Sequence, residues 1–478
     1  MIRSSVMFFL GSLLLVLSGF MLVCALFSLA WGEPDFIYIL LSAGLTGAVG
    51  LLMRFILPGK KEITIAESFS LVALAWILSG VFGALPFYFY GVFDSFLSAF
   101  FESVSGFTTT GATLIEDVES LPRGILLWRS LTQWLGGMGI IVLFVAFLPR
   151  LGIRGINLVK AELPGPITDR VVPRVAQMAK WLWLIYLLFT VILFLLLMLS
   201  GVSFFNSINH AFTTMPTGGF SPLNDSIAGL NNPLAEGIIT VFMLFAGINF
   251  ALYYLFLHGD RKAFWRNEEF RFYFSVVLVS IMLVTLTLLF YYQPWEALLK
   301  GAFQVASILT TTGYATADFD AWPPFLRTLL LFFMFVGGMG GSTSGSMKQA
   351  RFLLLFKVAF REIYRLVHPS AVTTVKLGKK AVSEQVLRNV SGFVFMFLLL
   401  HVITTLALSA MGLNLETAFS ASIASLGNVG PGLNLVGPEE TYQVIPPAGR
   451  LLLSLMMVVG RLEIFTILIF FTGLVRKP

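Results

Sequence analysis

The sequence predicts an all-α, polytopic membrane protein built from four similar repeats around a pseudo-fourfold axis, preceded by an N-terminal two-helix hairpin. Of its 478 residues, 57% are hydrophobic and only 12% are charged, which is too little polar surface for a water-soluble protein of this length. Long apolar segments alternate with short ones along almost the whole chain. Four glycine-containing loops, each after a short apolar segment, indicate the repeats.

The first two apolar segments, near residues 7–31 and 35–57, form the predicted hairpin, residues 1–62. The first segment is long enough to span a bilayer and lacks a small-residue cleavage site. We therefore interpret it as a retained transmembrane helix rather than a signal peptide. Its Cys24 is the single cysteine of the chain, so the sequence contains no disulfide framework and no cysteine metal site.

Each repeat is predicted to contain a long helix, a short re-entrant helix, a glycine loop and a second long helix. The long first helices are expected near 66–92, 181–201, 271–292 and 386–410, and the second helices near 123–149, 233–258, 322–357 and 446–474. The stretches between them are too short to span a bilayer: Asp94 to Phe107, Phe204 to Thr214, Trp295 to Leu309 and Leu415 to Ser425. The repeats then occupy residues 63–165, 166–266, 267–380 and 381–478.

The four loops carry the functional prediction. They read Thr108-Thr-Thr-Gly111-Ala-Thr113, Met215-Pro-Thr-Gly218-Gly-Phe220, Thr310-Thr-Thr-Gly313-Tyr-Ala315 and Gly427-Asn-Val-Gly430-Pro-Gly432. Non-helical backbone at membrane depth occurs where it is packed in protein or lines a wet cavity, and glycine readily turns its carbonyl toward an axis. Four such loops around one axis, at the carboxyl ends of short helices, suit a cation. The predicted ion-selecting residues are Thr110, Gly111, Thr217, Gly218, Thr312, Gly313, Val429 and Gly430.

The third of the long second helices contains Gly337-Gly-Met-Gly-Gly-Ser-Thr-Ser-Gly-Ser-Met347, followed by Lys348. Because each glycine costs about 1 kcal/mol in a helix interior, the helix should break there. We predict a movable gate, although close packing of small residues against another helix is an open alternative. The gate residues are Gly337, Gly338, Gly340, Gly341, Ser342, Thr343, Ser344, Gly345 and Lys348.

Arg461 lies near the middle of the last apolar segment and is predicted to act with the gate. A charge at the bilayer centre costs about 2.5–3.5 kcal/mol even on the mildest scale, so Arg461 should face a cavity or a partner. It could form an electrostatic barrier or clamp the gate loop, and the alternative is an anchor that reaches the cytoplasmic interface. The polar residues of the short helices, among them Glu102, His210 and Gln304, are expected to hydrogen-bond to neighbouring loops.

The charged residues predict an orientation in the membrane. Basic residues gather at 60–61, 150–180, 261–271, 348–388 and 476–477, and acidic residues on the alternate connections. The positive-inside rule then places both termini in the cytoplasm, while the acidic loops face outward and attract cations. Because the net charge of +6 is confined to these loops, we do not predict nucleic-acid binding.

These residues and motifs resemble the Trk/Ktr/HKT superfamily of potassium transporters. The four loop motifs and the extra hairpin are similar to its bacterial TrkH branch over almost the whole chain. The resemblance implies helix–pore-helix–filter–helix repeats, K⁺ at the filter carbonyls as the transported ion, and a gate at Gly337 to Met347 with Arg461. It also implies a multi-pass protein of the bacterial inner membrane, no organic cofactor, a homodimer and a cytosolic TrkA-like nucleotide-binding regulatory subunit. Relatives often carry more glycine where this chain reads Ser-Gly-Ser-Met-Lys348.

We therefore expect a channel-like potassium pore and no enzyme activity. A potassium symporter coupled to Na⁺ or H⁺ is the main alternative, although Glu102 is the only candidate for an intramembrane carboxylate relay. An intramembrane enzyme with a lipid substrate is a further alternative, but no nucleophile motif or metal-ligand spacing supports it. A purely structural membrane anchor would tolerate bulky residues at all four loop glycines.

Overall fold

The computed structural model describes residues 4–56, 65–139, 175–371, 373–378 and 380–464, and almost all of its regular structure is helical. Six described helices are long and apolar enough to cross a membrane, or seven if α11 and α12, bent by 91° at their junction, form one span. This confirms the predicted all-α polytopic fold. Several parts of the sequence predictions lie outside the described residues: helix ends 140–149 and 465–474, the repeat boundaries at 62–63 and 165–166, and the basic residues at 60–61, 150–174 and 476–477.

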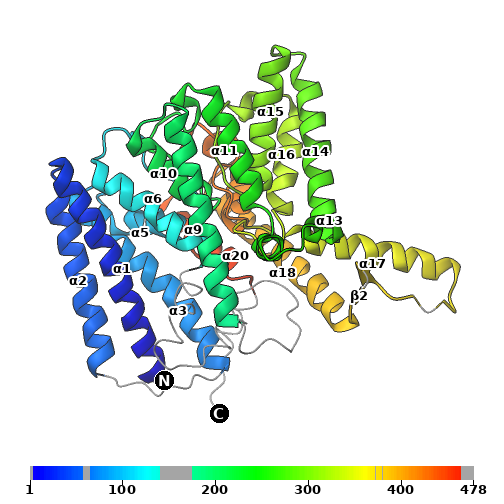
Figure 1. Cartoon of the computed structure of the whole chain (residues 1–478), viewed down its shortest axis with the longest axis horizontal. Helices are drawn as coiled ribbons and strands as arrows, with labels where there is room; N and C mark the ends of the chain where they lie inside the picture. Colours follow the sequence, from blue (N-terminus) through cyan, green and yellow to red (C-terminus); the bar gives the residue numbers. More distant parts are fainter. Residues whose placement is uncertain (1–3, 57–64, 140–174, 372, 379, 465–478) are drawn as a thin grey trace.

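The N-terminal hairpin consists of α1 (Ser4–Trp31) and α2 (Phe36–Ile56), which lie side by side at one edge of the molecule (Figure 1). Asp35, in the turn between them, is fully buried, and its Oδ2 accepts a hydrogen bond of 2.7 Å from the amide of Ile125. That amide belongs to the first turn of α6 (Arg123–Gly137), where a carboxylate satisfies a free N–H group and the helix dipole. The hairpin is thereby attached to the first repeat.

The first helices and the short helices lie close to their predicted positions. The first helices are α3 (Ile65–Gly83) with its continuation α4 (Leu85–Tyr90), α9 (Val175–Leu199), α14 (Glu268–Leu288) and α18 (Glu384–Ala410). The short helices are α5 (Phe96–Phe107), α10 (Phe204–Thr214), α15 (Pro294–Leu309) and α19 (Leu415–Leu426). Local chemistry determines where the short helices begin, because Ser95, Ser203 and Asn414 cap three of them and Pro294 opens the other.

The second helices are shorter than predicted. They are α6, α11 (Pro233–Ala246), α16 (Pro324–Val336) and α20 (Pro447–Arg461). The prediction of an uninterrupted helix over 233–258 is wrong, whereas the break predicted within 322–357 is present between α16 and the next helix. Asn249 caps a new helix, α12 (Phe250–Leu257), just after α11, and α17 (Gln349–Val367) begins after a long glycine-rich loop.

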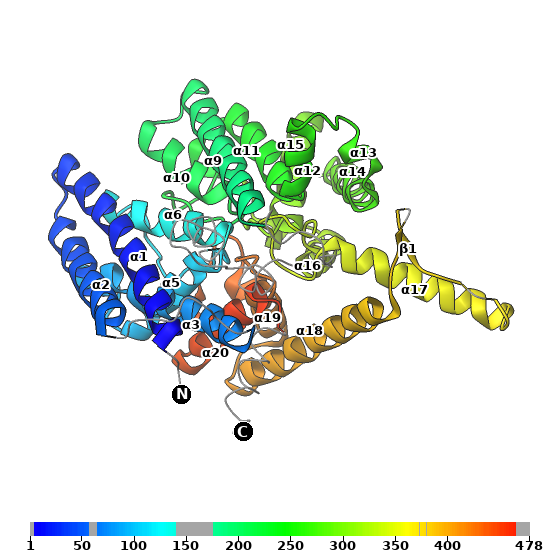
Figure 2. The same cartoon turned by 60° about the horizontal axis from the view of Figure 1, so that its bottom comes forward.

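The remaining elements are connections at the two ends of the bundle. Helix α17 extends away from the helical body in both Figure 1 and Figure 2, and it is followed by a two-stranded antiparallel hairpin, β1 (Lys376–Leu377) and β2 (Lys380–Ala381). The short helical turns are α13 (Ala263–Arg266), η2 (Ala228–Leu230), η3 (Phe319–Ala321), η4 (Asn434–Val436) and η5 (Tyr442–Val444).

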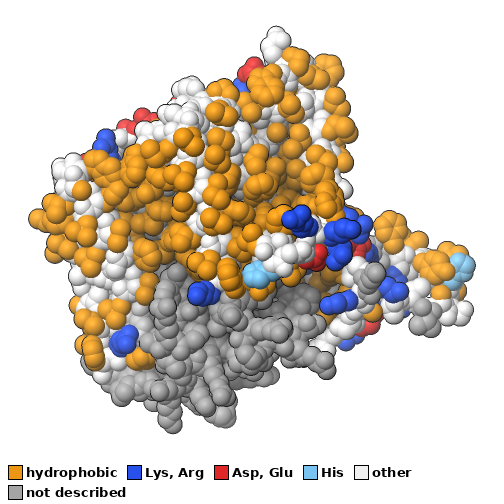
Figure 3. Space-filling model, viewed as in Figure 1, with side chains coloured by type: hydrophobic (Ala, Val, Ile, Leu, Met, Phe, Trp, Pro, Cys, Tyr) orange, Lys and Arg blue, Asp and Glu red, His pale blue; other side chains and the backbone are white. Residues whose placement is uncertain are grey.

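The surface of the molecule is that of a multi-pass membrane protein. Figure 3 shows a broad belt of hydrophobic side chains across the helical body, with charged side chains above and below it. Large apolar residues of the outer helices, such as Leu187, Leu286 and Leu406, are exposed. Such a belt suits a lipid environment, in which helices satisfy their own backbone hydrogen bonds and can present apolar side chains outward.

Candidate functional site

The four glycine loops share one backbone conformation. A left-handed residue follows each short helix, with φ of 55°, 57°, 59° and 53° at Thr109, Thr217, Thr311 and Asn428. Two residues later comes a glycine with positive φ, namely Gly111, Gly219, Gly313 and Gly430. The residue between them donates its amide to the carbonyl five residues earlier, at 2.9, 2.9, 2.8 and 2.8 Å for Thr110, Gly218, Thr312 and Val429. This pattern ends a helix by satisfying its last carbonyls.

The shared pattern sets the correspondence between loops. In the second loop, Gly219 occupies the place of Gly111, Gly313 and Gly430, whereas Gly218 corresponds to Thr110, Thr312 and Val429. The pair Thr217 and Gly218, which the sequence aligned with the other pairs, therefore stands one residue earlier in the backbone. Two adjacent glycines in this loop hide the offset from sequence comparison.

The four positive-φ glycines form a closed ring, which we call the glycine ring. A Cβ atom on Gly111 would collide with the carbonyl oxygen of Gly218, and the same holds for Gly219 against Thr312 and for Gly313 against Val429. Gly430 in turn meets the carbonyl oxygen of Thr110. The loops thus contact one another in chain order and the fourth closes on the first. Only glycine combines these close contacts with a left-handed φ at little cost.

All four residues of the glycine ring line a cavity of about 690 Å³ on the side of the acidic connections. Glu116, Glu439 and Glu440 also line this cavity. Carboxylates around a concave mouth produce a negative potential that attracts cations. Among the described residues, no three His, Cys, Asp or Glu side chains form a metal-binding group. The candidate ion ligands are the backbone carbonyls that the sequence predicts.

Glu102, one of the polar residues of the short helices, hydrogen-bonds to a neighbouring loop, as expected. Glu102 accepts hydrogen bonds from Thr113 Oγ1 (2.9 Å), from the amide of Leu114 (3.0 Å) and from Arg129 Nε (2.8 Å). Arg129 also donates to the carbonyl of Ser221 at 2.9 Å, and it joins the loops of the first two repeats. Because both charges are buried, each needs the other, and loss of one partner would leave an unpaired buried ion.

The other two polar residues differ. His210 is bonded through both ring nitrogens, to Asn206 O at 2.8 Å and to Ser221 Oγ at 3.1 Å. In contrast, neither amide atom of Gln304 has a hydrogen-bond partner in the part of the chain that the structure describes, so the expectation that Gln304 bonds to a neighbouring loop is wrong.

Residues 337–348, which we call the 337–348 loop, lie on the opposite side of the glycine ring. The amide of Gly345 donates to Thr311 Oγ1 at 2.6 Å, and Thr343 Oγ1 donates to the carbonyl of Met215 at 3.0 Å. A Cβ atom on Gly345 would collide with the carbonyl oxygen of Gly427. The loop therefore packs against the second, third and fourth glycine loops at the ends of their short helices.

Arg461, the last residue of α20, joins this loop to the first repeat. Its Nη1 donates to the carbonyl of Thr343 at 2.8 Å. Its Nη2 donates to the carbonyls of Gly136 and Gly137, at 2.9 and 2.7 Å, where α6 ends. Carbonyls at a helix carboxyl end carry partial negative charge and hold a cation well. A contact between Arg461 and the loop, which the sequence left open, is therefore present.

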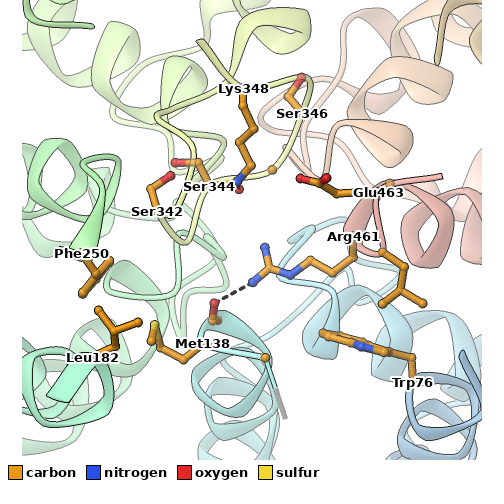
Figure 4. A pocket seen from close by; sticks show the side chains of 16 residues that line it. Trp76, Met138, Leu182, Phe250, Ser342, Ser344, Ser346, Lys348, Arg461 and Glu463 are labelled. Atoms are coloured by element: carbon orange, nitrogen blue, oxygen red, sulfur yellow. Dashed lines mark hydrogen bonds between the residues drawn. The ribbon is translucent and has the colours of Figure 1, made fainter. Parts of the chain in front are cut away.

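A second cavity, of about 800 Å³, lies beside the 337–348 loop (Figure 4). Its lining includes Ser342, Ser344, Lys348, Arg461 and Glu463. The side chains of Lys348 and Arg461 reach toward it from different directions, and Lys348 Nζ donates to the carbonyl of Ser344. The glycine ring lines one cavity and the 337–348 loop lines the other.

Two further contacts anchor the loop, and sequence reasoning missed both. Glu269, in the first turn of α14, accepts a hydrogen bond of 2.6 Å from the amide of Gly340. Arg351, just after the loop, pairs with Glu463 at 2.6 Å. A buried position for Glu269 has no local sequence signal, since an acidic residue in the first turn of a helix is ordinary.

Comparison with known proteins agrees with this architecture. The model of the TrkH family, described as a cation transport protein, matches residues 48–476. The chain is 41% identical to the Trk system potassium uptake protein TrkH of Escherichia coli (strain K12), over 97% of each chain. It is 36% identical to the Trk system potassium uptake protein TrkG of the same organism, over 86% of each.

Among solved structures, the crystal structure of the potassium transporter TrkH from Vibrio parahaemolyticus superposes with a TM-score of 0.88. At 36% sequence identity, the superposition covers 99% of this chain and 98% of that one. The resemblance predicted from the loop motifs is confirmed. A family model that matches most of the sequence, near-complete coverage of its relatives and a shared fold establish that the chain belongs to the TrkH family of cation transport proteins.

Proposed function

We propose that this protein carries K⁺ across the bacterial inner membrane through a channel-like pore whose filter is the glycine ring. The closed ring of four loops, bordered by an acidic cavity, is the observation that carries the proposal. The names of its relatives, which are potassium uptake proteins, support K⁺ as the ion. The filter comprises the eight residues predicted from sequence, with Gly219 added.

In this mechanism, backbone carbonyls of the four loops replace the hydration shell of K⁺. The acidic residues of the outer cavity concentrate cations at the mouth. The membrane potential then drives the ion inward, with about 2.3 kcal/mol per charge per 100 mV. The chain itself performs no covalent chemistry, so we assign it no enzyme activity and no organic cofactor.

The 337–348 loop is the proposed gate. It lies directly beneath three of the four filter loops, and Arg461 clamps it to the first repeat. Opening requires the hydrogen bonds of Arg461 to break or to rearrange. Because the loop leads into α17, movement of that helix is a direct way to displace it.

The proposed partners are a second copy of the chain and a cytosolic TrkA-like nucleotide-binding subunit. Helix α17 projects from the body with exposed apolar residues, among them Phe360 and Leu366, which suits contact with another protein. Basic residues on α17 and the β1–β2 hairpin, such as Arg365 and Lys380, are exposed or half-buried and suit a regulatory subunit. With the basic connections in the cytoplasm, both termini lie there as well.

The test is ⁸⁶Rb⁺ uptake into proteoliposomes of the purified full chain, with K⁺, Na⁺ and Li⁺ as competitors. We expect K⁺ to block ⁸⁶Rb⁺ uptake and Na⁺ to leave it unchanged. Gly313→Ser should relax this preference for K⁺ over Na⁺. Gly91→Ser is the matched control, because Gly91 has the same φ of 84° with open space around it, at the end of α4. Equal effects of the two substitutions would contradict the filter.

Two outcomes separate the alternatives. Uptake that stops when both the Na⁺ and the proton gradients are removed would favour the coupled symporter. A silent wild-type protein is examined again with the 337–348 loop shortened, since a closed gate alone would then be relieved. Silence of that variant as well would reject the channel.

A further inference from the structure

One buried side chain from outside the glycine loops contacts the filter directly. Gln133 lies on α6 and has no solvent exposure. Its Nε2 donates a hydrogen bond of 2.6 Å to the carbonyl oxygen of Gly218, and its Oε1 accepts one of 3.1 Å from the amide of Phe220. A single amide thus holds a carbonyl and an N–H group on either side of Gly219.

This contact explains why residue 218 is a glycine. Gly218 does not have a positive φ, so its backbone conformation is open to any residue. A Cβ atom there would overlap the amide group of Gln133. The limitation at this position is therefore space, and Gln133 occupies that space.

The other three loops solve the same packing problem in another way. At the positions equivalent to Gly218 they carry Thr110, Thr312 and Val429, which are all buried. Thr110 Oγ1 lies 2.8 Å from Thr108 Oγ1, and Thr312 Oγ1 lies 2.7 Å from Thr310 Oγ1, so each side chain is bonded within its own loop. Thr110 Oγ1 also accepts a hydrogen bond of 3.0 Å from Asn428 Nδ2 of the fourth loop. In the second loop, where residue 218 has no side chain, the supporting group comes from a helix, α6 of the first repeat.

The second helices show the complementary pattern. Gln133 stands three residues before the motif Gly136-Gly-Met-Gly139, and the residues three before Ala246-Gly-Ile-Asn249, Gly337-Gly-Met-Gly340 and Gly460-Arg-Leu-Glu463 are Met243, Met334 and Met457, all buried and apolar. Three repeats thus combine an apolar helix residue with a loop side chain. In the remaining pair the helix residue is polar, Gln133, and the loop residue, Gly218, has no side chain.

We propose that Gln133 is a positioning residue that fixes the Gly218 carbonyl and thereby contributes to discrimination between K⁺ and Na⁺. The proposal rests on the proposed function, in which this carbonyl belongs to the filter. A carbonyl that accepts a short hydrogen bond is restrained in direction, so it resists the inward movement that a smaller ion would need. Removal of the bond frees the second loop to adapt to Na⁺.

The first test replaces Gln133 by methionine, the residue of the other three repeats at this position. Gln133→Met removes both hydrogen bonds and keeps an unbranched side chain of similar size. We expect ⁸⁶Rb⁺ uptake to continue while the preference for K⁺ over Na⁺ as competitor falls about tenfold. Gln304→Met, which changes a buried glutamine without such bonds, should leave the preference intact. An unchanged preference in Gln133→Met would overturn the proposal.

The second test moves the side chain that fills this space from residue 133 of the helix to residue 218 of the loop. It also covers the case in which Gln133→Met does not fold. Gly218→Thr alone should abolish uptake, because the new side chain overlaps Gln133. Gly218→Thr together with Gln133→Ala provides the space and a loop side chain like that of Thr110 or Thr312. Recovery of at least tenfold in uptake by the double variant is expected, and no recovery would reject the proposal. Wild-type uptake is measured first, because a wild type without uptake would contradict the proposed pore rather than the role of Gln133.

Discussion

Adjacent residues of the second loop are glycines for different reasons. Gly219 has a φ of 79° and packs on the carbonyl of Thr312, so both its backbone and its surroundings require glycine. Gly218 has no positive φ, and the three atoms nearest to a Cβ at this position all belong to the side chain of Gln133. A sequence read without coordinates cannot separate these causes, since both residues appear as the same letter in the same motif.

The first prediction tests the offset of the second loop. Gly219→Ala should reduce the initial rate of ⁸⁶Rb⁺ uptake at least tenfold, because the methyl group collides with a backbone carbonyl that cannot rotate away. Gly201→Ala is the control, since Gly201 has a φ of 92° and no atom near its missing Cβ. Similar rates for the two variants would show that Gly219 is not a ring residue.

The second prediction concerns Arg461. Arg461→Met removes hydrogen bonds to three backbone carbonyls while keeping most of the apolar stem. Each bond to a charged group contributes about 1.5–3 kcal/mol, so we expect uptake without any regulatory subunit to rise at least tenfold. Arg450→Met, on the same helix but bonded to Ser98 near the opposite end, should not raise it. Unchanged uptake in Arg461→Met would argue that the arginine is only an anchor.

At the level of elements, the short helices were predictable and the breaks of the second helices mostly were not. Ser203 and the glycine loop mark both ends of α10, whose bounds agree with the prediction. In contrast, Gly247 and Asn249 are the only local signals of the 91° bend after α11. Apolar composition gives the length of a membrane segment, but packing against the loops decides where its helix stops.

Two adjacent carboxylates in the first turn of α14 bind three segments: the 337–348 loop, α17 and the β1–β2 hairpin. Glu269 accepts from Gly340 of the 337–348 loop, while Glu268 accepts from Lys357 Nζ at 2.5 Å and from the amide of Gly378 at 2.6 Å. The loop, α17 and the β1–β2 hairpin are therefore all fixed to one helix end.

The third prediction follows from this arrangement. Glu269→Leu deprives the Gly340 amide of its acceptor, so amide hydrogen exchange across residues 337–348 should become about tenfold faster, as expected for loss of one bond to a charged group. The control is Glu296→Leu, which removes a more exposed pair with Lys300 on α15. Equal exchange rates in the wild type and Glu269→Leu would mean that other contacts hold the loop.

On the scale of the whole molecule, α17 is largely uncovered by the rest of the described chain, since only Gln349 and Leu354 of this helix are buried. Phe360 is 70% exposed and Leu366 82% exposed, on a helix that projects from the body. The sequence predicted a homodimer only through the family resemblance, because an apolar face turned to lipid and one turned to protein have the same composition.

The fourth prediction tests this face. Phe360→Ser combined with Leu366→Ser should convert the proposed homodimer to a monomer in detergent, measured by light scattering after size exclusion. Phe290→Ser combined with Leu199→Ser changes equally exposed residues beyond α14 and at the end of α9, and it should leave the dimer intact. A dimer that survives the α17 substitutions would place the interface elsewhere.

Ring closure also has a consequence for biosynthesis. The contact between Gly430 and Thr110 joins residues from the last and first repeats, so the selective ring is incomplete until about nine-tenths of the chain has been made. A ribosome that delivers the repeats one after another inserts three glycine loops that have no fourth neighbour. A chain truncated before residue 427 lacks the fourth loop and therefore cannot close the glycine ring, however well its first three repeats are inserted.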